Sequence, residues 1–362
     1  MYLDRLALSD FRSYQKLSFT PAPNLNVLMG DNAQGKTNLL EGIGLLLVGR
    51  SMRGAKVAEL PRWGCDEARV SGQLCRHGAS RAVERIVAKR EGGAFALAGQ
   101  ACSWARAIPF GWPDLVILNG GPQARRSFLD GFAAKLTPAH AALVGRYRQV
   151  LERRNRLLQE SAGPAGLRGQ IEPWDDQLAE LGTELRDRRV DALTLLSREV
   201  QVVWRALAVS GEVMLEYRSP LGPGAGRGEL LAALRDRLGE EVRRGQTLAG
   251  PHRDDLGIDV DGRDLRTYGS RGQQRLMALA LRLAEARPVA EAVGSDPVLL
   301  LDDPLSELDE GAQARLLDHV DGAGQVFLTT PEPLLGEGRG VGWRVMGGTV
   351  TDMRGRTARG AA

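Results

Sequence analysis

The sequence is poor in cysteine and histidine, and it contains none of the common spacings of a metal or disulfide scaffold. The only cysteines are Cys65, Cys75 and Cys102, so their number is odd, and no C-x-x-C pair occurs. The four histidines are scattered, at His77, His140, His252 and His319. These counts exclude a disulfide framework and the usual zinc sites, and we expect free thiols in a reducing cytosol.

Long hydrophobic runs are also lacking. The longest apolar stretch, Ile43–Val48, contains Gly44 and is far too short to cross a bilayer. The first ten residues alternate charged and apolar positions, which is not the pattern of a signal peptide. We therefore expect a cytoplasmic protein with no membrane partner.

No charge of one sign dominates. The formal net charge is +3, which does not by itself indicate nucleic acid, because the distribution of charge matters more than its sum. The hydrophobic fraction of 43% is normal for a protein with a sizeable core. The length of 362 residues predicts two domains, or one large domain with an insertion.

The most informative segment reads GDNAQGKT and fits the phosphate-binding loop pattern G-x-x-x-x-G-K-[ST]. Residues 26–29 read as a buried strand before it, and a helix begins after it. This arrangement aims backbone N–H groups and a positive helix end at one point, which suits a polyphosphate. The predicted ligands of ATP in this loop are Gly30, Asp31, Asn32, Ala33, Gln34, Gly35, Lys36 and Thr37.

Two of these residues have specific expected roles. Lys36 would reach the β- and γ-phosphates, and the Thr37 hydroxyl would hold Mg²⁺. The alternative is a glycine-bearing turn between a strand and a helix that binds nothing.

An apolar run followed by two acids, Leu299–Leu301 and then Asp302 and Asp303, reads as a Walker B strand. Asp302 would hold Mg²⁺, and Asp303 would orient or deprotonate the attacking water as a catalytic residue beside Lys36. The alternative is a pair of solvated acids at a strand end.

Two further segments follow the order of an ABC-type ATPase. Residues 269–274, reading GSRGQQ, lie at the start of a predicted helix at about 272–285 and would form a second anion site. In that architecture this signature closes over the γ-phosphate held by a second subunit, so ATP would join a head-to-tail dimer. Ser306–Asp309 would lie at the dimer seam, cap a helix from Ser306, or do both.

The remaining pattern predicts an α/β domain with an inserted helical lobe. Strands are expected at residues 2–8 and 17–19, and the second of these would pair with the first. Short antiparallel strands are expected between residues 65 and 100, and a buried strand at 114–118. The predicted domain limits are 1–119 and 246–362 for the two halves of the ATPase lobe and 120–245 for the helical lobe. Further strands are expected at 254–260, 297–301 and 325–328, with a hairpin turn at Asp261 and Gly262. A helix at 312–320 would join the last two strands as a βαβ unit.

These motifs together resemble the RecF family, the bacterial recombination mediators related to SMC-type heads. The resemblance covers nearly the whole chain and depends on the segments at 6–14, 30–41, 49–51, 119–130, 250–255, 268–275 and 301–309. It implies a P-loop ATPase of ABC and SMC-head type, ATP-dependent dimerisation and slow, DNA-stimulated ATP hydrolysis. It also implies binding of gapped single-stranded and duplex DNA, cooperation with RecR and RecO, loading of recombinase and SOS induction.

The resemblance also extends the expected nucleotide site. It places Arg12 beside the nucleotide, together with Ser270, Gly272 and Gln273 of the signature. Asp303 stands where transport ATPases carry glutamate, and Thr329 and Thr330 stand where many of them have a switch histidine. These departures predict slow turnover, and the sequence does not locate the usual glutamine loop.

The expected DNA contacts are clusters of basic residues, which would give salt-dependent binding of phosphates. Such clusters are equally typical of solvated helix faces. The candidates are Arg50, Arg53, Lys56, Arg125, Arg126, Arg146, Arg148, Arg153, Arg154, Arg156, Arg186, Arg188 and Arg189.

His252 and Arg253 are interpreted as a locally hydrogen-bonded turn after Pro251 rather than as a contact near the nucleotide or the signature helix. Two other functions stay open on the sequence: the ATPase subunit of an ABC transporter, and an ATP-gated scaffold without hydrolysis.

Overall fold

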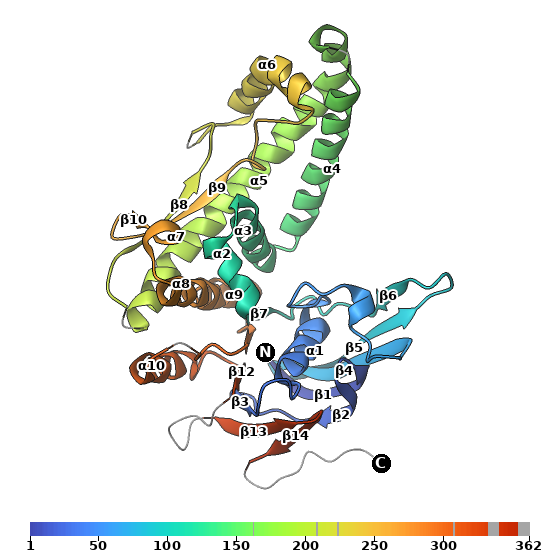
Figure 1. Ribbon diagram of the computed structural model, residues 1–362, viewed down its shortest axis with the longest axis vertical. Coiled ribbons are helices and arrows are strands. Elements are labelled where there is room, and N and C mark those ends of the chain that lie inside the picture. The colour runs from blue at the N-terminus through green and yellow to red at the C-terminus, as the bar shows by residue number, and fades with distance from the viewer. Residues whose placement is uncertain (162, 208, 223, 307, 332–339, 354–362) are drawn as a thin grey trace. The chain divides into compact units, whose positions relative to one another are not determined.

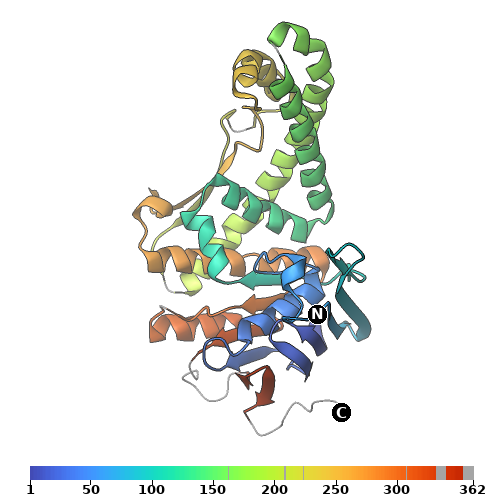
Figure 2. The ribbon, with the colours of Figure 1, turned by 45° about the vertical axis from the view of Figure 1, so that its right-hand side comes forward.

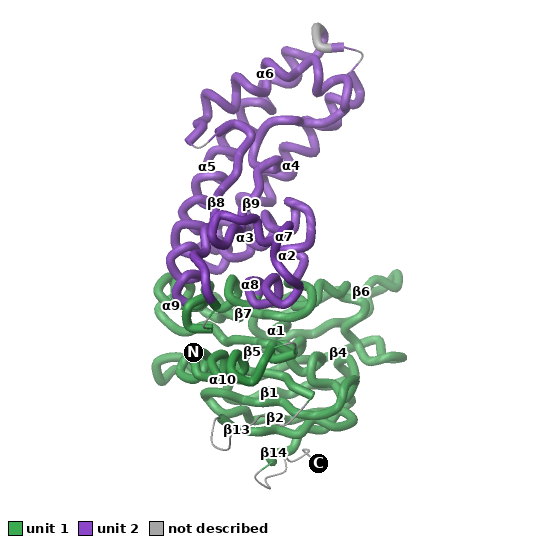
Figure 3. The backbone as a smooth tube through the Cα atoms, turned by 60° about the vertical axis from the view of Figure 1, so that its left-hand side comes forward, with its two compact units in different colours: residues 1–114, 203–209, 279–362 green, residues 115–202, 210–278 purple. Residues whose placement is uncertain are grey.

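The computed structural model describes residues 1–161, 163–207, 209–222, 224–306, 308–331 and 340–353. The chain divides into two compact units, coloured separately in Figure 3. Unit 1 comprises Met1–Asp114, Val203–Val209 and Leu279–Ala362, and unit 2 comprises Leu115–Val202 and Ser210–Ala278.

The first sheet of unit 1 is antiparallel and has five strands in the order β2-β1-β4-β5-β6 (Figure 1). Its members are β1 (Tyr2–Phe11), β2 (Tyr14–Phe19), β4 (Glu67–Arg76), β5 (Ala79–Lys89) and β6 (Phe95–Ala98). The alternation of apolar and polar residues predicted these strands, and the predicted pairing of residues 17–19 with the first strand is confirmed by the pair Leu8↔Leu17.

The second sheet of unit 1 has the order β14-β13-β3-β12-β11-β7. Its strands are β3 (Leu25–Met29), β7 (Ala107–Phe110), β11 (Val298–Leu301), β12 (Val326–Thr330), β13 (Val341–Met346) and β14 (Thr349–Asp352). All neighbours are parallel except β13 and β14. The apolar runs predicted as central strands are confirmed, because a parallel strand buried on both faces needs apolar residues throughout.

Helix α1 (Lys36–Val48) packs against strands of both sheets and is buried along most of its length. The core around it includes Leu6, Leu40, Val70 and Leu300, each at most 1% exposed. The remaining helices of unit 1 are η1 (Val57–Glu59), η2 (Trp112–Leu115), α9 (Ala286–Val293) and α10 (Glu310–Val320). Helix α10 joins the parallel strands β11 and β12, which confirms the predicted βαβ unit.

Unit 2 is mostly helical. Its main helices are α2 (Val116–Asn119), α3 (Pro122–Leu136), α4 (Ala139–Glu160), α5 (Pro164–Ala206) and α6 (Arg227–Arg244). Figures 1 and 2 show α4 and α5 side by side, and leucines at helical spacing join them to α6 in one apolar cluster. Helix α4 ends at Glu160 and α5 begins at Pro164.

A small antiparallel sheet of unit 2 has the order β10-β9-β8 and leads into two further helices. Its strands are β8 (Val213–Arg218), β9 (Asp255–Val260) and β10 (Arg263–Asp264), followed by α7 (Leu265–Tyr268) and α8 (Arg271–Leu283). The predicted turn between β9 and β10 forms at Asp261 and Gly262, both with positive φ (50° and 72°), as a tight hairpin requires.

The predicted strand at residues 114–118 is wrong. This segment forms the turn η2 and the short helix α2, while β7, four residues earlier, occupies the sheet edge beside β11. A short apolar run does not distinguish a strand from a buried helical turn. Strands β8, β13 and β14 were not predicted either.

The observed units also differ from the predicted domain limits, because residues 246–278 group with unit 2. Two long-range interactions explain this grouping. Strand β9 pairs with β8, and Arg125 of α3 donates two hydrogen bonds to Asp255.

Candidate nucleotide site

The phosphate loop joins β3 to α1, as the motif predicts. Gly30 (φ 153°) and Gly35 (φ 109°) adopt backbone conformations that side chains disfavour. A β-carbon at position 30 would lie 2.3 Å from the backbone oxygen of Val345. Both glycines are therefore required by the path of the loop.

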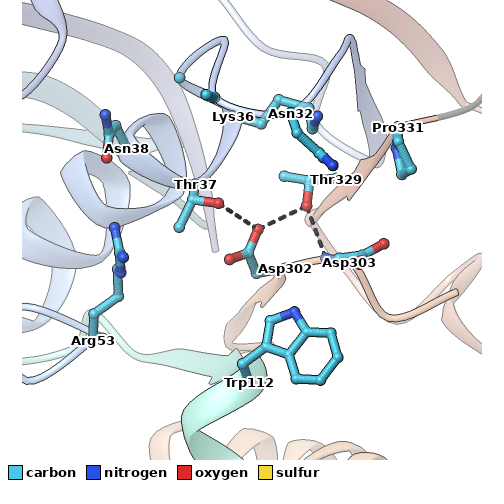
Figure 4. Close-up of a pocket in the computed structure, with 12 residues that line it drawn as sticks. Asn32, Lys36, Thr37, Asn38, Arg53, Trp112, Asp302, Asp303, Thr329 and Pro331 are labelled. Carbon is cyan, nitrogen blue, oxygen red and sulfur yellow. Dashed lines mark hydrogen bonds between the residues drawn. The ribbon is translucent and has the colours of Figure 1, made fainter. Parts of the chain in front are cut away.

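A cavity of about 310 Å³ opens at this loop (Figure 4). It combines the start of α1 with the carboxyl ends of β7, β11 and β12, which meet at one edge of a parallel sheet. The cavity is lined by Asn32, Ala33, Gly35, Lys36, Thr37, Asn38, Arg53, Trp112, Asp302, Asp303, Thr329 and Pro331.

Lys36 is 8% exposed, and its ammonium group donates hydrogen bonds to the carbonyl oxygens of Gly30 and, at 2.8 Å, Asp31. Burial lowers the pKa of Lys36, although the carboxylates of Asp303, Asp302 and Asp31 oppose that shift. The loop thus presents a buried cation and backbone N–H groups to the cavity, which suits an anion.

Asp302 accepts hydrogen bonds through one oxygen, Oδ1, from two hydroxyl groups. Thr37 donates at 2.9 Å and Thr329 at 2.8 Å, so the predicted pair of Thr37 and Asp302 comes together. In Figure 4 the dashed lines run from Thr37 through Asp302 and Thr329 to Asp303.

Asp303 has a positive φ of 50°, a conformation that is uncommon for residues other than glycine. Its backbone N–H donates to the Thr329 hydroxyl at 2.8 Å. The two adjacent acids therefore leave the end of β11 in defined directions, and both line the cavity.

The oxygen ligands of this site fit Mg²⁺. Thr37 and Asp302 offer a hydroxyl and a carboxylate oxygen, the type of ligand that Mg²⁺ prefers, and the ion usually takes its remaining ligands from phosphate and water. Among the described residues, no group of three or more His, Cys, Asp or Glu side chains is arranged to hold a metal ion by itself.

Several residues that line the cavity were not assigned to it from the sequence. Thr329 was noted only for replacing a histidine, and Arg53 was a candidate for DNA. Trp112, 54% exposed, lies on a turn that is held by a bond of 2.8 Å from the Gly111 N–H to Asp114. The sequence signal was the run Gly-Trp-Pro-Asp after an apolar strand, which predicts a turn at a sheet edge.

Arg12 is not among the residues that line the cavity. Its guanidinium group donates to both carboxylate oxygens of the buried Glu41, at 2.7 and 2.9 Å. The expectation that Arg12 contacts the nucleotide stays a prediction.

Ser270, Gly272 and Gln273 belong to unit 2 and do not line this cavity either. The Ser270 hydroxyl accepts from the Gln273 N–H at 3.2 Å, and the Gln273 side chain accepts from the Ser270 N–H at 2.9 Å. This reciprocal capping box opens α8.

The predicted cap at Ser306 is wrong. Asp309 begins α10, and its side chain accepts from the Ala312 N–H at 2.8 Å. Glu307 of the same segment lies outside the described residues.

Three of the candidate DNA contacts have buried side chains and structural roles in unit 2. Arg125 binds Asp255, Arg154 binds Asp175 and Glu241, and Arg189 binds Asp130. These three arginines are at most 3% exposed, so DNA phosphates do not reach them.

His252 has the local role that the sequence suggested. Its Nδ1 accepts from the Tyr147 hydroxyl at 2.7 Å, and its Nε2 donates to the Thr247 carbonyl at 3.1 Å. Burial lowers the pKa of His252 to about 4, so this histidine is neutral near pH 7.

Comparisons with known proteins identify the family. The domain described as RecF/RecN/SMC N terminal domain matches residues 2–334. The DNA replication and repair protein RecF of Moorella thermoacetica is 39% identical over 337 residues, covering 91% of this chain and 90% of that protein. The chain belongs to the RecF family. The RecF protein of Bacillus subtilis is 34% identical, covering 91% and 93%.

The fold of this chain is also similar to the folds of solved RecF structures. The structure of "the recombination mediator protein RecF-ATPrS in RecFOR pathway" has a TM-score of 0.84 at 28% identity, covering 97% of this chain and 98% of that one. The corresponding RecF-ATP structure has a TM-score of 0.83. An SMC head at 15% identity has a TM-score of 0.55 and shows the fold alone. The fold is thus an α/β ATPase head of RecF and SMC type, and none of its described helices is long and apolar enough to cross a membrane.

Proposed function

We propose that this chain is an ATP-dependent DNA-binding protein of recombinational repair that forms a dimer on ATP and hydrolyses ATP slowly. The observation that carries the proposal is the meeting of Lys36, Thr37, Asp302 and Thr329 in one cavity at the phosphate loop. The ATP named in the description of a solved relative with a TM-score of 0.83 supports the choice of nucleotide.

The residues of the cavity have different proposed roles in ATP hydrolysis. Lys36 and the loop N–H groups bind the phosphates, while Thr37 and Asp302 would hold Mg²⁺, which when bound neutralises phosphoryl charge. Asp303 orients a water molecule for attack on the γ-phosphorus and accepts its proton. The bond to the bridging oxygen breaks, giving ADP and phosphate. A short Asp303 side chain positions water less closely than glutamate, which supports slow turnover.

For DNA, the exposed arginines of α4 are better candidates than the buried ones. Arg146, Arg153 and Arg156 are exposed and follow the spacing i, i+7, i+10, which places them on one helix face. We infer that this face binds the phosphates of gapped or duplex DNA. On the basis of the family resemblance, we also propose cooperation with RecR and RecO, recombinase loading and SOS induction.

One experiment tests both ATP-dependent dimerisation and DNA binding. Size-exclusion chromatography with light scattering, with and without ATP and with gapped DNA, should show a dimer that requires ATP. Lys36→Ala should lose nucleotide binding, Asp303→Asn should keep ATP bound for longer, and Ser270→Arg should block only the dimer. An ATP-dependent dimer of Ser270→Arg would contradict the role of the signature.

The same samples distinguish the other functions. ATP hydrolysis that DNA stimulates without any membrane component excludes the transporter subunit. Equal lifetimes of ATP on wild type and Asp303→Asn would favour a scaffold without hydrolysis.

A further inference from the structure

Glu41 lies on α1, one helical turn after Thr37, and its side chain is completely buried. A buried carboxylate is costly unless ion pairs and hydrogen bonds compensate it. The phosphate loop itself does not need an acid at this position, because its motif ends at Thr37. The groups around Glu41 must therefore compensate the burial of its carboxylate.

Arg12 supplies the opposite charge. It binds both oxygens of Glu41, and its Nη1 donates to the Glu59 carbonyl at 2.6 Å. The bidentate geometry compensates the buried acid and connects the turn between β1 and β2 to α1.

Ser51 makes the second connection. Its hydroxyl donates to Oε1 of Glu41 and accepts from the backbone N–H groups of Arg53, at 3.1 Å, and Ala55, at 3.2 Å. A single hydroxyl thus joins Glu41 to the turn at residues 51–55.

That turn carries Arg53 to the nucleotide cavity. Arg53 is exposed, and it lines both the cavity at the phosphate loop and an adjoining cavity of about 240 Å³ beside Trp112. Thr37 and Asp302 line both cavities as well. The backbone that Glu41 fixes through Ser51 is therefore the backbone that places this guanidinium group.

We propose that Glu41 is a positioning residue that, through Ser51, holds Arg53 toward the phosphates of the bound nucleotide. The proposal rests on the proposed binding of ATP. In this arrangement Arg12 compensates the buried carboxylate, and Arg53 is the arginine that meets the ligand.

A double-mutant cycle on ATP affinity tests the proposal. Arg53→Ala should raise the Kd for ATP about tenfold, the effect of losing one charge-assisted hydrogen bond. In the Glu41→Gln background the same substitution should raise the Kd by no more than about twofold, because Arg53 is already displaced. A purely structural role for Glu41 would lower the melting temperature and leave the full effect of Arg53→Ala.

Ser51→Ala keeps the ion pair of Arg12 with Glu41 and removes only the connection to the turn. In the Ser51→Ala background, Arg53→Ala should again raise the Kd for ATP by no more than about twofold. If Glu41→Gln does not fold, Ser51→Ala still tests whether the connection through Ser51 positions Arg53. Ser71→Ala, a matched change on β4, should leave that effect at about tenfold. The proposal is wrong if Arg53→Ala has the same effect in every background, or has none in wild type.

Lys36→Ala separates this result from the proposed function. If wild type binds ATP and Lys36→Ala does not, nucleotide binding stands whatever the cycle shows. If wild type itself does not bind ATP, the proposed function fails, and the role of Glu41 fails with it.

Discussion

The Thr329 hydroxyl donates a hydrogen bond of 2.8 Å to Asp302 and accepts one of 2.8 Å from the backbone N–H of Asp303. One side chain on β12 thereby fixes both acids at the end of β11. Strand pairing brings it there, because Leu301 lies opposite Leu328, one residue before Thr329.

Thr329→Val keeps the shape of the side chain and removes the hydroxyl. Because the lost bond is made to a carboxylate, we expect kcat for ATP hydrolysis to fall about tenfold or more, in line with about 1.5–3 kcal/mol for such a bond. Single-turnover hydrolysis measures this change. Thr330→Val is the control for a hydroxyl lost from the same strand, and equal rates for wild type and Thr329→Val would contradict the assignment.

Arg125→Ala should destabilise unit 2 without acting through DNA. The substitution leaves Asp255 without its bidentate partner, and removing one member of a buried ion pair typically costs about 3–5 kcal/mol. Urea denaturation measures this loss. The exposed Arg148→Ala should change the free energy of unfolding by less than about 0.5 kcal/mol. A variant Arg125→Ala of normal stability with weakened DNA binding would reverse this interpretation.

The stability of unit 2 should fall as the pH is lowered below neutrality. The pKa of His252 is about 4 in the folded protein and 6.5 ordinarily, so the unfolded chain takes up a proton first. Stability is lost as pH falls from 6.5 toward 4, by about 2 kcal/mol at pH 5 relative to pH 7. His252→Gln should show a flatter profile across this window. A wild-type stability that is equal at pH 5 and pH 7 would contradict the neutral, buried histidine.

The ionisation of Asp130 should affect the stability of unit 2 over a separate and lower range of pH. Burial alone raises the pKa of Asp130, but hydrogen bonds from Arg189 and His140 outweigh that effect and lower it to about 2. Its contribution is present above its ordinary value of 3.8 and is lost as pH falls toward 2. Asp130→Asn should therefore weaken the pH dependence below about 4, without abolishing it, while leaving the His252 range intact. Equal acid profiles for wild type and Asp130→Asn, measured by unfolding at several pH values, would refute this role.

The exposed face of α4 gives a prediction for DNA. Replacing Arg146, Arg153 and Arg156 together by alanine should weaken duplex binding and reduce the slope of log K against log salt by about 3, near 0.9 per lost phosphate contact. Arg148→Ala, on another face of the helix, should leave the slope unchanged. Fluorescence anisotropy at several salt concentrations measures both. An unchanged slope in the triple variant would place the DNA elsewhere.

Local patterns predicted much of unit 1 because each depends on residues close in sequence. The phosphate loop requires glycine conformations, a lysine and a threonine within eight positions. The buried parallel strands appear as continuous apolar runs. The segment at 114–118 shows the limit of this reasoning, because the same apolar run suits a strand or a helical turn until the neighbouring β7 takes the sheet edge.

The sequence by itself determined the phosphate loop, the order of the motifs and the alternating and apolar strands, since steric and hydrophobic requirements act along a few consecutive residues. Only the tertiary structure decided which arginines face solvent and which lie buried against distant acids. It also brought Thr329 to Asp302 and Arg53 to the cavity, because both depend on partners that strand pairing and loop anchoring supply from elsewhere in the chain. The sequence specifies which side chains can carry a charge, but the burial of each one depends on residues tens or hundreds of positions away.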